Sequence, residues 1–180
     1  MDWSQLRRLE IGRKCRKTAF FDEFTGAIRN LESLKIGFDR AATRPPGWTI
    51  EPARRFIESI DALRHLIILN PGDQIDALWP AIRKHRRSLR SLVLPPLKHD
   101  PPYRENDLMR MRELREGIPE LAHLELDIPM DSSFYKPLST YIAILSDFSH
   151  LRTPGLCFSL PTDTSIFAPE YFQNYMGTQP

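Results

Sequence analysis

One short phrase, Leu-x-x-Leu-x-Leu or a close relative of it, recurs six times along the 180-residue chain. The first residues of successive copies lie 25, 32, 26, 32 and 30 residues apart. A period of this length predicts a repeat architecture, in which each copy forms the same unit and buries its apolar side against its neighbours. The copies are Leu6/Leu9/Ile11, Leu31/Leu34/Ile36, Leu63/Leu66/Ile68, Leu89/Leu92/Leu94, Leu121/Leu124/Leu126 and a degraded Leu151/Pro154/Leu156.

A stretch with helical spacing precedes each copy after the first. Apolar residues recur there three and four positions apart, which is typical of the apolar face of an amphipathic helix. Pro52, Asp73 and the pair Asn106 and Asp107 are expected to mark helix starts, whereas Pro80 in the third stretch predicts a kink or a late start. The apolar stripes are Phe20, Phe21, Phe24 and Ile28; Ala53, Phe56, Ile57 and Ile60; Ile75, Leu78, Trp79 and Ile82; Leu108, Met111, Leu114 and Ile118; and Leu138, Tyr141, Ile142 and Leu145.

The last two apolar residues of each phrase lie two positions apart, which predicts a short strand with both residues on one face. Strands joined through helices are expected to run parallel. Because parallel strands stack about 4.8 Å apart and packed helices need about 8–10 Å, a row of such units must bend. The sequence therefore predicts an α/β fold, a curved solenoid of about six repeats with short parallel strands on the concave face and helices on the convex face.

Residues 3–160 resemble the leucine-rich-repeat family, because they carry five good copies of the phrase and a degraded sixth. The long, helix-bearing repeats are similar to the ribonuclease-inhibitor-like class of that family, and to the repeat halves of F-box proteins, particularly the divergent ones of fungi. The resemblance to F-box proteins implies substrate recognition in a cullin-type ubiquitin ligase, with a ligase adaptor as a partner of a longer form. The chain departs from the pattern at Pro154, which stands where a leucine belongs, and no F-box helices precede the first phrase.

We expect residues 1–160 to form the leucine-rich-repeat solenoid, and residues 161–180 to be a C-terminal tail or the start of a further repeat. Solenoids need polar caps on their terminal repeats. This chain instead opens on a strand phrase and closes with apolar residues that include Phe167, Tyr171 and Phe172. We therefore expect the array to be part of a longer protein or a degenerate gene product, or to have its ends covered by partners.

The composition is that of an ordinary globular protein. Hydrophobic residues make up 41% and charged residues 27% of the chain, and a net charge of +2 is too small to argue for nucleic acid. No run approaches the roughly 18 apolar residues of a membrane span. Cys15 and Cys157 fall at opposite ends of the predicted array, too far apart to pair. Free thiols are typical of an intracellular protein, so we expect the cytoplasm or the nucleus.

Residues that alternate with the buried leucines are expected to face the concave surface. The middle position of successive strands gives Glu10, Lys35, Ile67, Val93 and Glu125, an apolar centre flanked by charges. Such an arrangement is typical of a protein interface, although strand propensity alone also accounts for the β-branched residues. The site predicted to bind a protein partner of unknown identity comprises Glu10, Lys35, His65, Ile67, Leu69, Val93, His123, Glu125 and Asp127.

Metal and catalytic chemistry find little support in the sequence. His65 and His123 occupy equivalent positions two repeats apart, about 10 Å along the strand ladder, which is too far to share a metal directly. Glu125, Asp127 and Asp131 are interpreted as solvated charges. The sequence contains no glycine-rich phosphate loop, HExxH or GxSxG motif. We therefore predict a non-enzymatic protein that uses neither a metal nor a cofactor.

Two basic clusters run through Arg13–Lys17 and Arg83–Arg87, and the second continues to Arg90. Such runs serve nuclear import or contact phosphates, but they also suit the solvated C-terminal end of a helix, where cations interact favourably with the helix dipole. We prefer the second interpretation and do not expect nucleic acid as a ligand. His85, His99 and His150 fall in helix or turn contexts and are expected on the surface.

Overall fold

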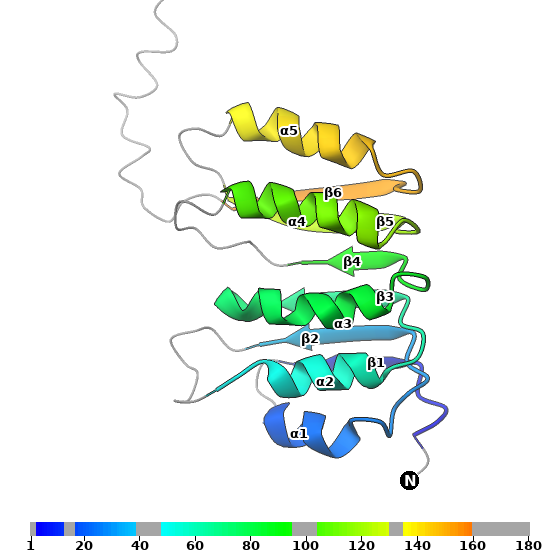
Figure 1. Ribbon diagram of the computed structural model, residues 1–180. Helices are drawn as coiled ribbons and strands as arrows, with labels where there is room; N and C mark the ends of the chain where they lie inside the picture. Colours follow the sequence, from blue (N-terminus) through cyan, green and yellow to red (C-terminus); the bar gives the residue numbers. More distant parts are fainter. Residues whose placement is uncertain (1–2, 13–16, 39–47, 95–103, 130–134, 160–180) are drawn as a thin grey trace, which may run out of the picture.

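The computed structural model describes residues 3–12, 17–38, 48–94, 104–129 and 135–159. Within them, six strands form one parallel sheet whose order follows the chain from β1 to β6 (Figure 1). The α/β class and the parallel strands expected from the repeated phrase are confirmed. The strands are β1 (Arg8–Ile11), β2 (Ser33–Gly37), β3 (His65–Leu69), β4 (Ser91–Val93), β5 (His123–Pro129) and β6 (Thr153–Ser159).

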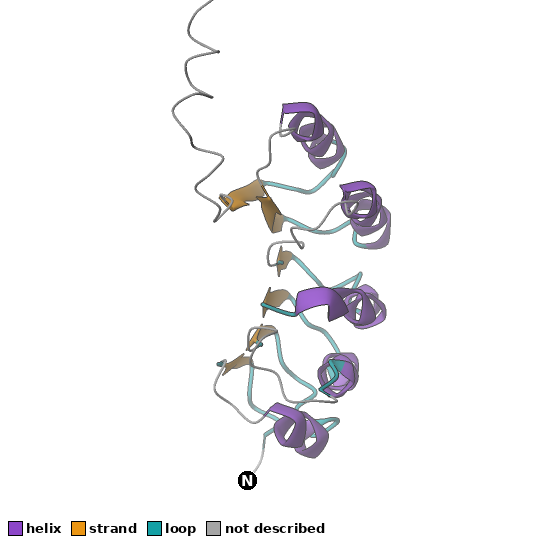
Figure 2. Ribbon diagram, turned by 90° about the vertical axis from the view of Figure 1, so that its left-hand side faces the viewer, coloured by secondary structure: helices purple, strands orange, loops and turns teal. Residues whose placement is uncertain are grey.

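A helix lies in each connection between neighbouring strands. Figure 2 shows these helices on one side of the sheet, so the described helices leave its opposite face uncovered. The helices are α1 (Lys17–Phe24), α2 (Glu51–Ser59), α3 (Trp79–Lys84), α4 (Arg104–Gly117) and α5 (Tyr135–Ser146), and a 3-10 helix, η2 (Gly72–Leu78), leads directly into α3.

The register of the sheet aligns the second leucine of each phrase in one row that faces the helices. Leu34, Leu66 and Leu92 pair in turn along this row, and all three are fully buried. Ile36 and Ile68 form the next buried row on the same face. Each such side chain stabilises the fold by about 1.5–3 kcal/mol before conformational entropy is subtracted.

The chain enters each strand through a repeated pair of backbone hydrogen bonds. The carbonyl of Arg64, for example, accepts bonds from the N–H groups of Arg90 and Ser91 at 2.8 and 3.0 Å. The equivalent carbonyl accepts the equivalent two bonds at each of the other junctions between described strands. This pattern satisfies the backbone groups of the turns and holds successive units in the same register.

Helix α2 packs on α1 through a cluster of aromatic rings. The ring centroid of Phe56 lies 5.5 Å from that of Phe21 and 5.9 Å from that of Phe20. Trp3 adds an edge-to-face contact with Phe24 at 5.2 Å. The apolar stripe expected around residues 20–24 is therefore the face on which the first two helices meet.

The starts of α3 and α4 can be compared with the start signals in the sequence. The break expected at Pro80 is confirmed, because η2 ends at Leu78 and Pro80 lies in the first turn of α3. Proline is tolerated there since the first N–H groups of a helix have no partner within the helix. The expectation that Asn106 and Asp107 open the fourth helix is wrong by two residues, because α4 begins at Arg104.

The degraded sixth phrase still forms a strand. In β6, Pro154 pairs with Leu124 of β5, and β6 is the last strand of the described sheet. Proline is accepted in such an edge strand because the ladder bond that it cannot donate is not needed on the open side. Several expectations lie outside the described residues: those for residues 161–180, Cys15, His99, Asp131, the Arg13–Arg16 part of the first basic cluster and most of the proline-rich loops.

Candidate functional site

The middle residues of the strands form one row on the sheet face that the described helices leave uncovered. In register order this row is Glu10, Lys35, Ile67, Val93, Glu125 and Gly155. The structure thus brings the five predicted middle residues together, one from each of five adjacent strands. We refer to this row, together with the residues two positions before and after it on the same strands, as the strand face.

The row has charged ends and an apolar centre. At one end the Nζ atom of Lys35 lies 2.7 Å from Oε1 of Glu10, in an exposed ion pair that contributes less than about 1 kcal/mol to stability. Ile67 and Val93 are half-buried and adjacent in the centre. At the other end Glu125 lies beside Gly155, where an added Cβ atom would come within 3.1 Å of the Cγ atom of Glu125.

A second row of the strand face consists of the first residues of the strands. It contains His65, Ser91 and His123 in register order, so Ser91 separates the two histidines as the repeat spacing predicted. The Nε2 atom of His123 lies 3.9 Å from Oε2 of Glu125 on the same strand. Among the described residues no three His, Cys, Asp or Glu side chains gather as a metal-binding group.

The remaining two predicted residues lie further along the strands. Leu69 is half-buried and pairs with Gly37 in the sheet. Asp127 pairs with Cys157 through the backbone, and the side chains of both lie outside the described part of the structure. Of the predicted site, the structure therefore defines a continuous patch around Ile67, with Leu69 two positions further along β3.

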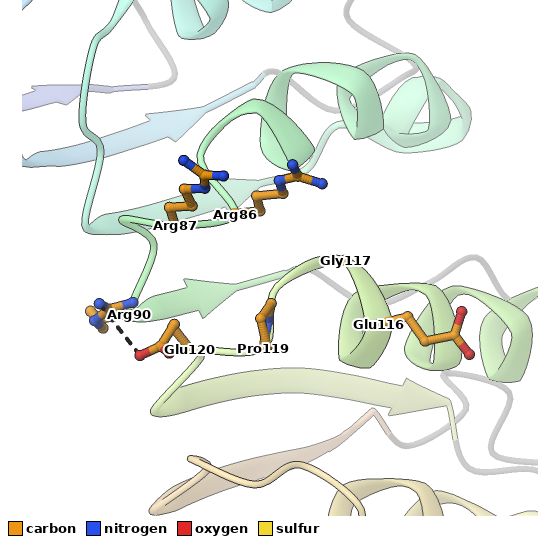
Figure 3. A pocket seen from close by; sticks show the side chains of 7 residues that line it. All are labelled: Arg86, Arg87, Arg90, Glu116, Gly117, Pro119 and Glu120. Atoms are coloured by element: carbon orange, nitrogen blue, oxygen red, sulfur yellow. Dashed lines mark ion pairs between the residues drawn. The ribbon is translucent and has the colours of Figure 1, made fainter.

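The second basic cluster borders an open groove of about 460 Å³ at the turns that precede β4 and β5 (Figure 3). The expectation that this cluster is merely the solvated end of a helix is incomplete, because acidic residues of the next unit stand opposite it. Glu113, Glu116 and Glu120 recur three and four positions apart, and this spacing could have predicted an acidic side opposite the cluster. The lining residues of this groove, which we name the Arg86 groove, are Arg86, Arg87, Arg90, Glu116, Gly117, Pro119 and Glu120.

The prediction that His85 lies on the surface is wrong. The side chain is 1% exposed, and its Nε2 atom lies 3.0 Å from the carbonyl oxygen of Ile57 in α2. The Nδ1 atom accepts a bond from the N–H of Leu63 at 3.4 Å, so a neutral ring with the proton on Nε2 satisfies both contacts. His85 is buried because it falls on the same face as Leu78 and Ile82, seven and three positions earlier.

The environment of His85 favours the neutral ring. Burial lowers the pKa of His85 most strongly, because the low-dielectric interior disfavours the imidazolium. The positive charge of neighbouring Lys84 lowers the pKa further, whereas the carbonyl of Ile57 and the carboxylate of Asp61 act in the opposite direction. The net effect is a lowered pKa, so His85 is a neutral link between units near pH 7.

Comparison of the chain with protein-family models, with curated proteins and with solved structures finds no match. None of the helices in the described residues combines the length and the apolar character that crossing a membrane requires.

Proposed function

We propose that the chain is a leucine-rich-repeat solenoid that acts without catalysis and binds a protein partner through the strand face. The observation that carries this proposal is the row from Glu10 to Glu125, which has an apolar centre between charged ends. This row lies on the sheet face that the described helices leave uncovered (Figure 2).

The proposed curvature follows from the spacing of the two layers. Neighbouring parallel strands are about 4.8 Å apart, whereas packed helices need about 8–10 Å. With one helix in each connection between strands, and with the helices on one side, the helix layer is the longer of the two. A sheet that bends away from its helices relieves this mismatch and makes the strand face concave.

The centre of the strand face has the chemistry of an interface core. Ile67 and Val93 are neighbours in the register, and Leu69 projects from the same side of β3 two positions from Ile67. Covering such side chains removes apolar area from water and stabilises a complex by about 25 cal/mol for each Å². The charged ends, Glu10 with Lys35 and Glu125 with His123, then form a polar rim that selects the partner by charge.

Affinity purification with mass spectrometry, from cells that express the chain, tests this proposal. The test variant is Ile67→Asp/Val93→Asp, and the control is Ile142→Asp on α5, where the isoleucine is 51% exposed. Circular dichroism first establishes that both variants are folded. We expect the test variant to lose the partner by on the order of 100-fold, because carboxylates buried at an interface centre lack counter-charges, and the control to retain it.

The opposite pattern contradicts the proposal. If the partner is retained by Ile67→Asp/Val93→Asp, or is lost equally with Ile142→Asp, the strand face is not the binding surface. The same experiment addresses the more specific proposal of a substrate receptor in a ubiquitin ligase. Recovery of cullin-ligase components with the wild-type chain supports that role, and a partner set without them counts against it.

A further inference from the structure

We propose that the Arg86 groove binds the phosphate group of a phosphorylated serine or threonine in a partner protein. The groove lies at the turns before β4 and β5, not on the strand face, so this inference is independent of the proposed binding through the strand face (Figure 3). Some cations of the basic cluster are paired within the fold, and others have no acidic partner among the described residues.

Two of the cations near the groove, Arg83 and Lys84, serve the fold. The guanidinium of Arg83 lies 2.8 Å from the carboxylate of Glu113 in the next helix. The ammonium of Lys84 donates to the carbonyls of Glu58 and Ile60, the first of these at the C-terminal end of α2. These contacts link neighbouring units, so neither Arg83 nor Lys84 is fully available to a ligand.

Arg90 is only partly engaged. One of its guanidinium nitrogens lies 3.5 Å from Oε2 of Glu120, which is a long contact. Its Nη1 atom is buried and has no hydrogen-bond partner in the described part of the chain. A buried donor without an acceptor is unfavourable, so the described residues satisfy the guanidinium of Arg90 only in part.

Arg86 and Arg87 are the uncommitted cations of the groove. Both are exposed, and among the described residues neither guanidinium has an ion pair or a hydrogen-bond acceptor. Figure 3 shows the two side chains leaving the turn before β4 in the same direction. They therefore present two adjacent positive groups that no described residue neutralises.

The backbone that carries these two arginines is firmly held. The N–H of Arg86 donates to the carbonyl of Arg83 at 3.1 Å, and the N–H of Leu89 donates to that of His85 at 2.8 Å. The side chain of His85, the residue before Arg86, is buried and contacts the carbonyl of Ile57 in α2. A ligand that binds Arg86 and Arg87 has only their side chains to order, which lowers the entropic cost of binding.

A phosphate monoester fits the charge and the dimensions of this site. It carries a charge of about −1.5 to −2 near pH 7, which matches the two uncommitted guanidinium groups. Guanidinium forms paired, charge-assisted hydrogen bonds to phosphate oxygens. A volume of about 460 Å³ is within the range of about 300–1,000 Å³ that is typical of ligand sites, and accommodates a phosphorylated side chain with its adjoining backbone.

The acidic side of the groove favours a single phosphate over a nucleic acid. Glu116 and Glu120 line the groove opposite the arginines, and Glu113 borders the adjoining hollow. A continuous phosphate backbone that crossed this surface would approach all three carboxylates, and their repulsion offsets the attraction to the arginines. A protein segment with one phosphorylated residue brings a single phosphate group to Arg86 and Arg87, so it meets less of this repulsion.

Nuclear magnetic resonance titration of the full chain tests this inference. The probe is a five-residue peptide with phosphoserine between alanines, and its unphosphorylated form is the matched ligand control. We expect the phosphopeptide to shift the side-chain N–H signals of Arg86 and Arg87, the unphosphorylated peptide to shift neither, and inorganic phosphate to compete. We expect the variant Arg86→Gln/Arg87→Gln to weaken binding at least tenfold.

The control variant is Arg64→Gln/Arg112→Gln, which removes the same charge from two exposed arginines outside the groove and leaves the affinity within twofold. If the glutamine variant of the groove does not fold, Arg86→Lys/Arg87→Lys keeps the charge but loses the paired geometry, and we expect it to bind several-fold more weakly than wild type. Equal binding of both peptides, an unchanged affinity in the groove variants, or tighter binding of a single-stranded RNA through Arg86 and Arg87 overturns the inference.

Discussion

Replacing His85 with alanine tests whether a single buried ring holds neighbouring repeat units together. In the wild-type chain the ring joins the carbonyl of Ile57 in α2 to the N–H of Leu63, which precedes β3. The variant leaves the N–H of Leu63 without its acceptor, whereas the carbonyl of Ile57 keeps the bond that it accepts from the N–H of Ile60 at 3.2 Å. It also creates a cavity next to Leu78 and Ile82, which share the buried face with His85.

The expected loss of stability comes from the unsatisfied N–H of Leu63, the lost bond to Ile57 and the cavity. An unsatisfied buried polar group costs about 1–3 kcal/mol. The contact to Leu63 is long at 3.4 Å, but its N–H loses its acceptor, whereas the carbonyl of Ile57 loses only one of its two donors. We therefore assign the larger polar share to Leu63. With the cavity included, we expect His85→Ala to lower the free energy of unfolding by about 3 kcal/mol.

Thermal unfolding followed by circular dichroism measures this loss. For a chain of this size 1 kcal/mol corresponds to about 2–4 °C, so the expected fall in Tm is about 6–12 °C. The control is His150→Ala, which changes an exposed histidine and is expected to alter the free energy by less than about 0.5 kcal/mol. A loss below 1 kcal/mol for His85→Ala refutes the structural role assigned to the ring.

The pH dependence gives the same prediction an independent check. Because the pKa of His85 is lowered in the folded chain, the unfolded chain takes up the proton first as pH falls below the ordinary value of 6.5. The contribution of the neutral ring is therefore complete above pH 6.5 and declines below it. We expect wild type to lose more stability than His85→Ala between pH 7 and pH 5, and parallel profiles refute the argument.

Two further substitutions separate buried contacts from exposed ones. Leu66→Ala, at the centre of the buried row, is expected to lower the free energy of unfolding by about 3 kcal/mol; in urea unfolding, a loss no greater than that of Ile67→Ala contradicts the assignment of faces. Lys84→Met removes the donor to the carbonyls of Glu58 and Ile60 and is expected to cost about 1 kcal/mol, with a matching drop in Tm; an unchanged Tm shows that these contacts do not stabilise the junction.

The strands were the most predictable part of the fold, because their pattern recurs. A period of two inside each phrase placed Leu34, Leu66 and Leu92 on one buried face, and their pairing in the sheet is confirmed. The same alternation brought Ile67 and Val93 side by side on the other face. That alternation determines which residues share a face but not what covers that face, so the binding role of the strand face stays a prediction.

The predictions for His85 and for the basic cluster failed because each depended on one segment of the sequence without the segments that pack against it. His85 stands in a basic run, which suggested a solvated helix end, but its spacing from Leu78 and Ile82 continues the buried stripe. The acidic residues opposite Arg86 and Arg87 belong to the next repeat, so the groove emerges only once the units are stacked. Several neighbouring polar residues can each mark a helix start, so the predicted start of α4 at Asn106 was two residues too late.

Photo-crosslinking from the strand face tests the central claim most directly. A benzoylphenylalanine residue is introduced in place of Ile67 in one chain and in place of Ile142 in another, and each chain is irradiated in cells that express it. The account predicts a covalent adduct with a partner protein from position 67 at the centre of the strand face, and none from position 142 on α5. An adduct from position 142 together with none from position 67 contradicts it.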